Sequence, residues 1–210
     1  KHYKGAKVYS VEPDSEAVTV AGAMAVAENL NYKPVVGVGE ALPYEDNYFD
    51  LIICHTVIEH VQDESAVISE MTRVLSIDGY IHLDAPNYVW PYEPHLGIWC
   101  IPVLGKSSVR FMSCLQGKRK ENWYIADLRF VTPRKLEKIF RKNNLVWINR
   151  VKDKLTKTAI GDSSIKQYRF ASKTLFFLNK GRISKALIFL LIKIGLYPSV
   201  MYTLKKSHKI

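Results

Sequence analysis

Acidic and imidazole side chains follow several apolar segments of this sequence, at or soon after the point where each segment ends. They are Glu12, His55, Glu59, His60 and, within a longer connecting segment, His95. An imidazole or a carboxylate in such a position can take a proton from a bound acceptor, and a carboxylate can also accept hydrogen bonds from two hydroxyl groups. These residue types therefore predict acid–base chemistry or the binding of a hydroxyl-bearing ligand.

The segments that position these residues alternate between strand-like and helix-like patterns. Apolar, β-branched runs predict strands at residues 7–12, 34–38, 49–54 and 80–84. Asp14 and Asp63 are suitable N-caps for the intervening helices, and Asp78-Gly79 predicts the end of the second helix. This order predicts an α/β fold with a doubly wound, mostly parallel sheet and helices on both faces. Ligands of such sheets bind outside the carboxyl ends of the strands, where residues 12, 38–41, 54–60 and 84–87 lie.

The rest of the sequence predicts an insertion and a carboxyl-terminal elaboration. Residues 88–127 are rich in aromatic residues, Pro and Gly, and are too long for an ordinary connection, which is typical of a lid or substrate loop. The patterns that follow predict a helix at 132–143, a strand at 145–151, a helix at 172–196 and a short antiparallel edge strand at 200–204. We expect one domain over residues 1–210, with a core at 1–87, a lid at 88–127 and a basic, partly helical remainder at 128–210.

Charge divides the sequence into an acidic and a basic half. Residues 1–104 hold 5 Lys and Arg against 15 Asp and Glu, a net charge of −10, whereas residues 105–210 hold 25 against 5, a net charge of +20. The basic half can attract nucleic acid, an anionic membrane surface or a phosphorylated substrate, or it can simply be a solvated surface. The apolar run at 186–196 is shorter than the ~20 residues that span a bilayer, so it suits either a membrane interface or a buried helix.

Cysteine usage and the amino-terminal residues bear on the cellular compartment. Cys54, Cys100 and Cys114 are odd in number and widely spaced, which predicts neither a disulfide framework nor a zinc site. The sequence shows no apolar amino-terminal run with a basic flank, so no signal peptide is expected. We expect a cytoplasmic location, with a peripheral position at the inner face of the membrane as the alternative.

Three neighbouring motifs carry a family resemblance. Gly37-Val38-Gly39-Glu40-Ala41-Leu42-Pro43-Tyr44, Asp46-Asn47-Tyr48-Phe49-Asp50 and Val57-Ile58-Glu59-His60-Val61 together resemble the central stretch of class I S-adenosylmethionine-dependent methyltransferases of the small-molecule type. The resemblance covers about residues 5–90 and implies a Rossmann-like sheet with S-adenosylmethionine as the cofactor. It also places the family's first strand and glycine-rich loop upstream of Lys1, so we expect both to be missing from this sequence.

The resemblance assigns cofactor-binding roles to individual residues. It implies that Glu12, followed by Pro13, accepts the two ribose hydroxyls of the cofactor, and that the backbone of Gly39, Glu40 and Ala41 meets the adenine edge. Val38 stands where the family often has Asp, which leaves either Glu40 as a substitute or a lower affinity. His55 is expected to lie against the cofactor rather than the acceptor.

Methyl transfer from a sulfonium is an in-line displacement, in which a base is needed only when the acceptor must lose a proton. His95 is our preferred base, and His60 with Glu59 is the alternative, although the sequence favours a structural role for His60. Glu93 and His95 have the side chains of metal ligands, but two ligands are too few, so we expect no metal.

The predicted activity is the O-methylation of a small-molecule, glycan or lipid-linked acceptor. The net charge of +20 in residues 105–210 motivates an RNA methyltransferase as an alternative, with nucleic acid the weaker choice of partner. A degenerate, non-catalytic domain for binding or membrane docking is a further alternative, because a shared fold hosts many functions.

Overall fold

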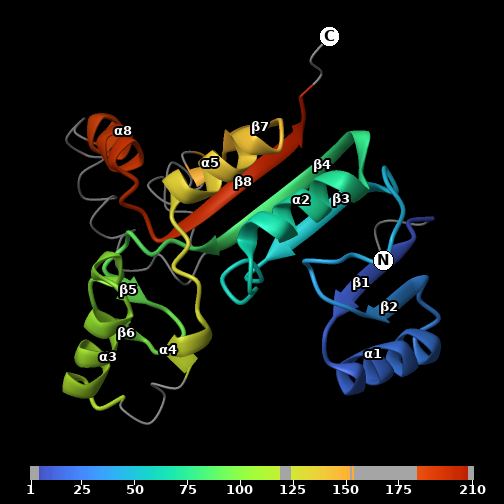
Figure 1. The fold of residues 1–210 in the computed structure, drawn as a ribbon, viewed down its shortest axis with the longest axis horizontal. Coiled ribbons are helices and arrows are strands. Elements are labelled where there is room, and N and C mark those ends of the chain that lie inside the picture. The colour runs from blue at the N-terminus through green and yellow to red at the C-terminus, as the bar shows by residue number, and fades with distance from the viewer. Residues whose placement is uncertain (1–4, 119–123, 152, 154–183, 208–210) are drawn as a thin grey trace.

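The computed structural model describes residues 5–118, 124–151, 153 and 184–207 of the chain (Figure 1). Within them the strands form a four-stranded mixed sheet, a separate two-stranded parallel sheet and a two-stranded hairpin. The α/β architecture predicted from the sequence is confirmed.

The two-stranded parallel sheet contains β1 (Val8–Glu12) and β2 (Tyr32–Val36), joined by α1 (Ser15–Ala27). The helix begins where predicted, because the Asp14 side chain accepts a hydrogen bond of 2.8 Å from the Glu16 backbone N–H. The second strand lies two residues earlier than the predicted range of 34–38. The residues that follow it turn back on themselves instead, through a bridge between Val38 and Ala41.

The four-stranded sheet has the order β3 (Phe49–His55), β4 (Leu75–Pro86), β8 (Ser199–Lys206) and β7 (Leu145–Asn149). β3 and β4 are parallel, whereas β8 is antiparallel to both of its neighbours. The prediction of an antiparallel strand near residues 200–204 is confirmed, but its edge position is wrong. β8 lies inside the sheet because Val200, Tyr202 and Leu204 are at most 1% exposed and hydrogen bonds run along both of its sides.

The turn predicted at Asp78-Gly79 is also wrong. α2 (Glu64–Val74) ends at Val74, and β4 begins directly at Leu75 and continues past Gly79. The pairing with β3 shifts register here, between Phe49 and Leu51, so extra residues of β4 are accommodated as an irregularity within the strand. A Cβ atom on Gly79 would lie 2.8 Å from Leu75 Cδ1 and 3.0 Å from the Phe49 carbonyl oxygen, so glycine is required for close packing rather than for a turn.

Two helices cover one face of the four-stranded sheet, α2 and α5 (Pro133–Lys142) (Figure 1). α5 begins as predicted, with the Thr132 hydroxyl accepting a hydrogen bond from the Lys135 backbone N–H and with Pro133 in its first turn. Ile68, Phe140 and Tyr202 are among the fully buried side chains between these helices and the sheet. Helices on the second face stay a prediction, because that face exposes Leu51 and Ile53 in the part of the chain that the structure describes.

The predicted lid is a small folded unit with its own apolar core. It contains the hairpin β5 (Tyr92–Glu93) and β6 (Ile98–Trp99), the 3-10 helix η1 (Pro102–Leu104), α3 (Lys106–Leu115) and α4 (Tyr124–Asp127). Its core is formed by Leu96, Ile98, Cys100, Val109 and Ile125. The division of the chain into 1–87, 88–127 and 128–210 stays a prediction.

The apolar carboxyl-terminal segment forms α8 (Ser184–Ile194), and residues 172–183 of the predicted helix lie outside the described residues. Phe189 is 68% exposed and Ile194 is 49% exposed, so this end of the helix is not the buried core helix that the sequence also suggested. Among the helices that the structure describes, none combines the length and apolarity needed to cross a membrane.

Candidate active site

Glu12 closes β1, at the end of the two-stranded sheet. Its side chain is half-buried, and its Oε1 atom accepts a hydrogen bond of 3.3 Å from the backbone N–H of Asp14. Its carbonyl oxygen accepts a hydrogen bond of 3.1 Å from the Gly37 backbone N–H, which joins the end of β1 to the residues after β2. Pro13 is exposed. The carboxylate is therefore held at the strand end, beside the segment predicted to meet the adenine.

That segment, residues 39–41, packs closely on α2. A Cβ atom on Gly39 would lie 3.2 Å from Val67 Cγ2, so the absence of a side chain lets the backbone approach the helix. The Ala41 backbone N–H donates to the Val38 carbonyl oxygen at 3.2 Å, which closes a tight turn. The turn brings its backbone against the helix that follows β3.

The Glu40 side chain ties the same turn to the start of α2. Its Oε1 atom accepts hydrogen bonds from the backbone N–H groups of Gln62, at 2.7 Å, and of Asp63, at 3.3 Å. One carboxylate oxygen thus satisfies two amides at the amino terminus of a helix, where negative charge is stabilising. This contact gives Glu40 a positioning role that the sequence did not suggest.

His55 lies at the carboxyl end of β3 and is the most open of the predicted site histidines. Its side chain is 63% exposed, and its Nδ1 atom lies 3.8 Å from Asp84 Oδ2 at the end of the neighbouring strand β4. The next residue, Thr56, has a positive φ of 51° and donates its backbone N–H to the Asp84 carbonyl oxygen at 2.8 Å. The chain leaves the sheet sharply here and presents His55 at the sheet edge.

Glu59, His60 and His95 come together, one ligand-type atom from each lying within 4.8 Å of those of the other two. Glu59 is fully buried, its Oε1 atom lies 4.0 Å from His60 Nε2, and neither of its carboxylate oxygens has a hydrogen-bond partner on another described residue. The rings of His60 and His95 pack edge to face at 5.2 Å, and the Tyr124 hydroxyl lies 3.3 Å from His60 Nε2. The structure therefore brings together all three residues that the sequence proposed for catalysis.

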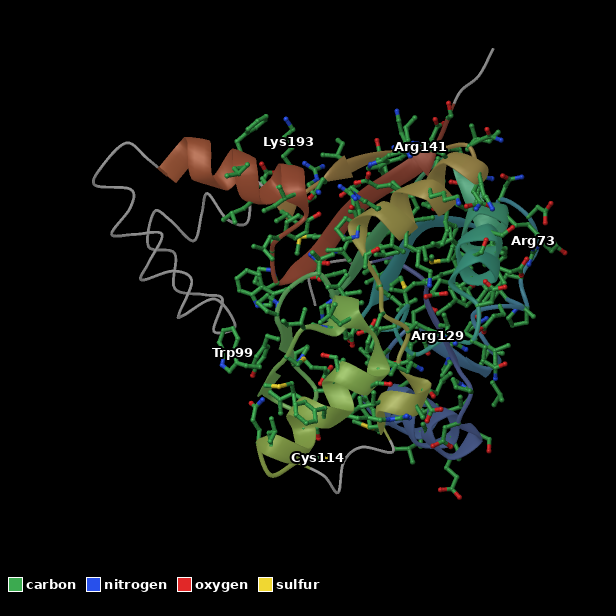
Figure 2. The ribbon with its side chains drawn as sticks, turned by 60° about the vertical axis from the view of Figure 1, so that its left-hand side comes forward. Arg73, Trp99, Cys114, Arg129, Arg141 and Lys193 are labelled. Atoms are coloured by element: carbon green, nitrogen blue, oxygen red, sulfur yellow. The ribbon has the colours of Figure 1, made fainter. Side chains whose placement is uncertain are left out.

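Arg129 holds the backbone of this cluster in place (Figure 2). Its backbone N–H donates to the Glu59 carbonyl oxygen at 2.7 Å, and its Nε atom donates to the Val61 carbonyl oxygen at 3.0 Å. These contacts connect the segment between α4 and α5 to the loop after β3. The cluster is thus supported from a part of the chain that is distant in sequence.

Glu93 orients His95. It is fully buried, and its Oε1 atom lies 2.7 Å from His95 Nδ1, while Tyr88 donates its hydroxyl to the same oxygen at 3.3 Å. The other oxygen, Oε2, accepts a 2.6 Å hydrogen bond from the Leu96 backbone N–H. With Nδ1 carrying the proton toward Glu93, the lone pair of His95 resides on Nε2.

The environment shifts the pKa values of the cluster in different directions. Burial raises the pKa of Glu59 to about 7, and the charges of Asp84 and Glu93 act in the same direction. Burial, followed by the charge of His95, lowers the pKa of His60. The hydrogen bond to Glu93 raises the pKa of His95. The cluster thus combines a neutral imidazole, a more basic imidazole and an acid that ionises near neutrality, a combination typical of catalytic and binding sites.

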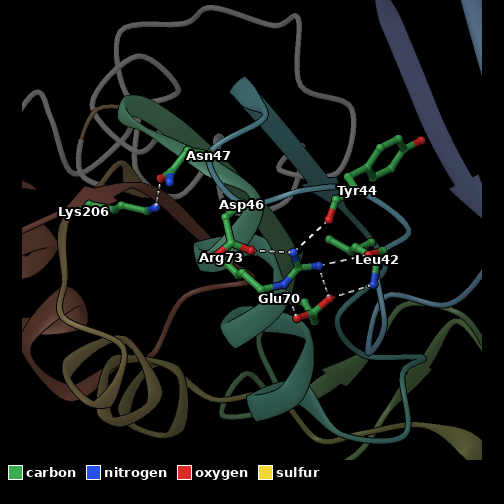
Figure 3. A network of polar contacts seen from close by, with 7 residues as sticks. All are labelled: Leu42, Tyr44, Asp46, Asn47, Glu70, Arg73 and Lys206. Carbon is green, nitrogen blue, oxygen red and sulfur yellow. Dashed lines mark hydrogen bonds and ion pairs between the residues drawn. The ribbon is translucent and has the colours of Figure 1, made fainter.

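A second polar network lies at the carboxyl-terminal end of α2, around Arg73 (Figure 3). The guanidinium donates to both Glu70 oxygens at 2.8 Å, to Asp46 Oδ1 at 2.9 Å and to the carbonyl oxygens of Tyr44 and Leu42 at 2.8 and 3.0 Å. Glu70 also accepts the Leu42 backbone N–H at 2.8 Å. This network fixes the residues that follow the 39–41 turn.

Sequence reasoning proposed Glu59, His60 and His95 but missed the residues that support them. Glu93 was considered only as a metal ligand, although an acid two residues before a histidine is a usable signal for an oriented imidazole. Tyr124 and Arg129 gave no signal, because they reach the cluster only through the packing of α4 and the following segment. The Arg73 network also gave no local signal in the sequence.

Comparison with known families supports the resemblance seen in the motifs. Residues 1–83 match the sequence profile of the family described as a methyltransferase domain. The match contains Glu12, the 39–41 turn, His55, Glu59 and His60, and it ends within β4. The lid and the carboxyl-terminal part lie outside it.

Curated relatives match this chain over part of their length. Ajmaline N-methyltransferase of Rauvolfia serpentina is 44% identical over 61 residues, which are 28% of this chain and 21% of that protein. The ubiquinone biosynthesis O-methyltransferase of Bartonella tribocorum is 26% identical over 148 residues, which are 70% of this chain and 54% of that protein. The chain thus spans about half or less of the length of these relatives.

The fold as a whole matches solved methyltransferases. A geranyl diphosphate methyltransferase in complex with S-adenosylmethionine superposes with a TM-score of 0.55 and 14% sequence identity, over 97% of this chain and 70% of that one. S-adenosylmethionine is the cofactor that this family and these neighbours indicate. Residues 1–83 therefore match the methyltransferase domain family, and the fold of the chain is that of these solved methyltransferases.

Proposed function

We propose that the protein transfers the methyl group of S-adenosylmethionine to a hydroxyl group of a small-molecule, glycan or lipid-linked acceptor. The observation that carries this proposal is the pair formed by Glu93 and His95, with 2.7 Å between the carboxylate oxygen and Nδ1. An oriented imidazole that presents a free nitrogen is needed for an acceptor that must lose a proton, and a hydroxyl is such an acceptor. A tertiary amine acceptor would not need it.

The proposed reaction is a single displacement. The acceptor oxygen forms a bond to the methyl carbon while the carbon–sulfur bond breaks, and S-adenosylhomocysteine leaves with the electron pair of that bond. The hydroxyl proton passes to Nε2 of His95, whose imidazolium is stabilised by the Glu93 carboxylate. His60 and Glu59 complete the group, with the 3.3 Å contact between His60 and Tyr124 holding the second imidazole beside the first.

The cofactor-binding assignments are part of the same proposal. Glu12 is proposed to accept the ribose hydroxyls, because its carboxylate lies at the end of β1, where the Asp14 amide donates one hydrogen bond to it. The backbone of Gly39, Glu40 and Ala41 is proposed to border the adenine. Pro13, which follows Glu12 at the end of β1, is proposed to belong to the same cofactor-binding surface. His55, which is 63% exposed at the end of β3, is proposed to border the cofactor.

Two measurements on the full-length protein test the proposal. Titration with S-adenosylmethionine by calorimetry should give saturable binding that Glu12→Ala weakens by roughly tenfold, about the value of one charge-assisted contact. Transfer of a labelled methyl group should then be assayed with acceptor sets that differ only in the acceptor atom. Transfer to hydroxyl acceptors that His95→Asn reduces by roughly 100-fold supports the proposal. Transfer confined to amine or carbon acceptors contradicts it.

The basic half of the sequence motivates one alternative, an RNA methyltransferase. Of the 20 acidic residues in the chain, only 5 lie in residues 105–210, against 25 Lys and Arg. RNA binding driven by backbone phosphates weakens steeply as salt is raised. Binding to mixed-sequence RNA at low salt that disappears at higher salt would favour this alternative. No detectable binding at low salt would remove it.

The exposed apolar end of α8 and the basic charge around it bear on the proposed lipid-linked acceptor. Phe189, Leu190 and Ile194 are between 49% and 68% exposed beside Lys193 (Figure 2). Such a surface is suited to the interface of an anionic membrane. We keep a cytoplasmic location, with a peripheral position at the inner face of the membrane, as a prediction. Sedimentation with vesicles of anionic and of neutral lipid tests it, and equal recovery with both would contradict it.

A further inference from the structure

Glu59 has an environment that its neighbours in the protein do not explain. It is fully buried, and neither carboxylate oxygen has a hydrogen-bond partner on another described residue. Buried carboxylates in native proteins are paired, hydrogen-bonded or bound to a metal ion, because an isolated one is strongly destabilising. His60 Nε2 lies 4.0 Å from Glu59 Oε1, beyond hydrogen-bonding distance, so a closer cationic partner of this carboxylate is to be sought in something that the site binds.

The groups that surround Glu59 are metal ligands. One atom from each of Glu59, His60 and His95 lies within 4.8 Å of those of the other two. Ligand atoms that are about 2.0–2.2 Å from an ion lie roughly 3–4 Å apart, so the three side chains need to approach by only about 1 Å to share one. Two imidazoles and a carboxylate suit zinc, manganese, iron or cobalt in the divalent state.

Glu93 prepares His95 for this role. The 2.7 Å contact with Glu93 Oε1 places the proton on Nδ1 and leaves the Nε2 lone pair free to coordinate. A carboxylate behind a metal-bound histidine is a recurring support, because it fixes the ring and increases its basicity. The Glu93 carboxylate is itself held by the Leu96 amide at 2.6 Å and by the Tyr88 hydroxyl at 3.3 Å.

We infer that Glu59, His60 and His95 bind one divalent transition-metal ion, with its remaining coordination positions open to water or to an acceptor oxygen. The sequence-based prediction that no metal is bound considered only Glu93 and His95 as ligands. The fold instead adds Glu59 and His60 as ligands and moves Glu93 behind His95, so the ligand set rises to three.

The catalytic consequence of the ion rests on the proposed O-methylation. A bound ion lowers the pKa of a coordinated hydroxyl and can hold the acceptor oxygen toward the methyl carbon. In that state Nε2 of His95 is a ligand, and the ion replaces it in activating the acceptor. In the metal-free state Nε2 of His95 acts as the base, as proposed above. The two states predict different responses to a chelator.

Metal binding should be measured on the full-length protein without cofactor or acceptor. After dialysis against a chelator, calorimetric titration with Zn²⁺ and with Mn²⁺ should give close to one ion per chain for at least one of them. Glu59→Gln and His95→Asn should each weaken that binding by roughly 100-fold, and Glu93→Gln by roughly 10-fold, as for a residue behind a ligand. His82→Asn, which changes a histidine of β4 outside the cluster, should leave binding unchanged.

Substitution of Co²⁺ provides a spectroscopic readout that does not depend on activity. Visible absorption bands typical of nitrogen and oxygen ligation should form in the wild type and be lost in His60→Asn and His95→Asn, with circular dichroism reporting that both variants are folded. A stoichiometry below roughly 0.2 ions per chain, far from the one ion expected for a single site, overturns the inference. Equal binding in the cluster variants and in His82→Asn also overturns it. If these binding tests overturn the metal site, methyl transfer to hydroxyl acceptors that persists in chelator still leaves the proposed function standing.

Discussion

Glu59 and Glu70 are two carboxylates close together in the sequence, on either side of the start of α2, and their environments are opposite. Glu70 is held by Arg73 through two hydrogen bonds of 2.8 Å and by the Leu42 amide, and the hydrogen bond from Arg73 lowers its pKa. Glu59 is fully buried without a hydrogen-bond partner on another described residue, and burial raises its pKa to about 7.

This difference separates a stabilising network from a binding site. Arg73 donates to two backbone carbonyl groups and two carboxylates, so removing the guanidinium takes one donor from each of these four groups. Because Glu59 is fully buried without such a network, we expect it to reduce the stability of the unliganded protein, as functional residues often do. The comparison predicts that substitutions in the two regions will change stability in opposite directions.

The largest effect is expected from Arg73→Met, which breaks the stabilising network. The substitution leaves Glu70 and the Leu42 and Tyr44 carbonyl groups without the guanidinium, so the free energy of unfolding should fall. Urea denaturation measures it.

Arg134→Met is the matched control for Arg73→Met, since Arg134 is an exposed arginine on α5. Its effect should stay within about 0.5 kcal/mol, as for surface substitutions in general. Similar losses in the two variants would show that the network around Arg73 has no special role in stability.

Glu59→Gln should change the free energy of unfolding in the opposite direction to Arg73→Met, and by a smaller amount. In the presence of a chelator at pH 8, we expect the variant to be about 2 kcal/mol more stable than the wild type, because it removes a buried charge that has no hydrogen-bond partner on another described residue. The folded-state pKa of about 7 is above the ordinary value of 4.5, so the folded chain retains a proton that the unfolded chain has lost as the pH rises between these values. Wild-type stability therefore declines from pH 4.5 to 7, and the advantage of the variant should vanish near pH 4.5. A variant that is less stable than the wild type at pH 8 would contradict the comparison.

Glu93→Gln should change catalysis more than stability. The amide keeps the volume of the side chain but removes the charge that orients His95, so kcat for hydroxyl acceptors in metal-free protein should fall about tenfold, or about 1.4 kcal/mol, with little change in KM. Because the hydrogen bond to Glu93 raises the pKa of His95, the acid limb of the pH–rate profile should move to lower pH. Glu45→Gln, at an exposed glutamate of the loop before β3, is the control. An unmoved profile would mean that Glu93 does not act through His95.

The smallest effect is the acid dependence of the Arg73 network. Glu70 has a lowered pKa in the folded state, so its contribution is present above the unfolded-state pKa and is lost as the pH falls through the folded-state pKa. The stability difference between the wild type and Glu70→Gln should therefore shrink in acid, opposite in direction to the difference for Glu59→Gln. Denaturation series at several pH values compare the two directly, and parallel curves would erase the distinction between the two carboxylates.

Local patterns predicted most of the elements that border the site. The caps at Asp14, Asp63 and Thr132 are formed by side chains adjacent in sequence to the amides that they accept, so short-range rules are sufficient to find them. The predictions that were wrong concern contacts between strands that are distant in sequence. β8 lies inside the sheet because β7 pairs with its outer side, and Gly79 packs against β3 rather than ending a helix.

The sequence by itself determined the order of strands and helices, the residue types at the strand ends and, through the motifs around residues 37–61, the resemblance that the match of residues 1–83 to the methyltransferase domain family supports. Periodicity, capping and motif spacing are local, and they are readable without the fold. Only the tertiary structure decided that His95 meets Glu59 and His60 after β3, that Glu93 stands behind His95 and that neither Glu59 oxygen has a hydrogen-bond partner on another described residue. These contacts depend on how residues 88–127 pack against the loop after β3. A contact between two segments that are distant in sequence cannot be predicted from the residue pattern of either segment alone.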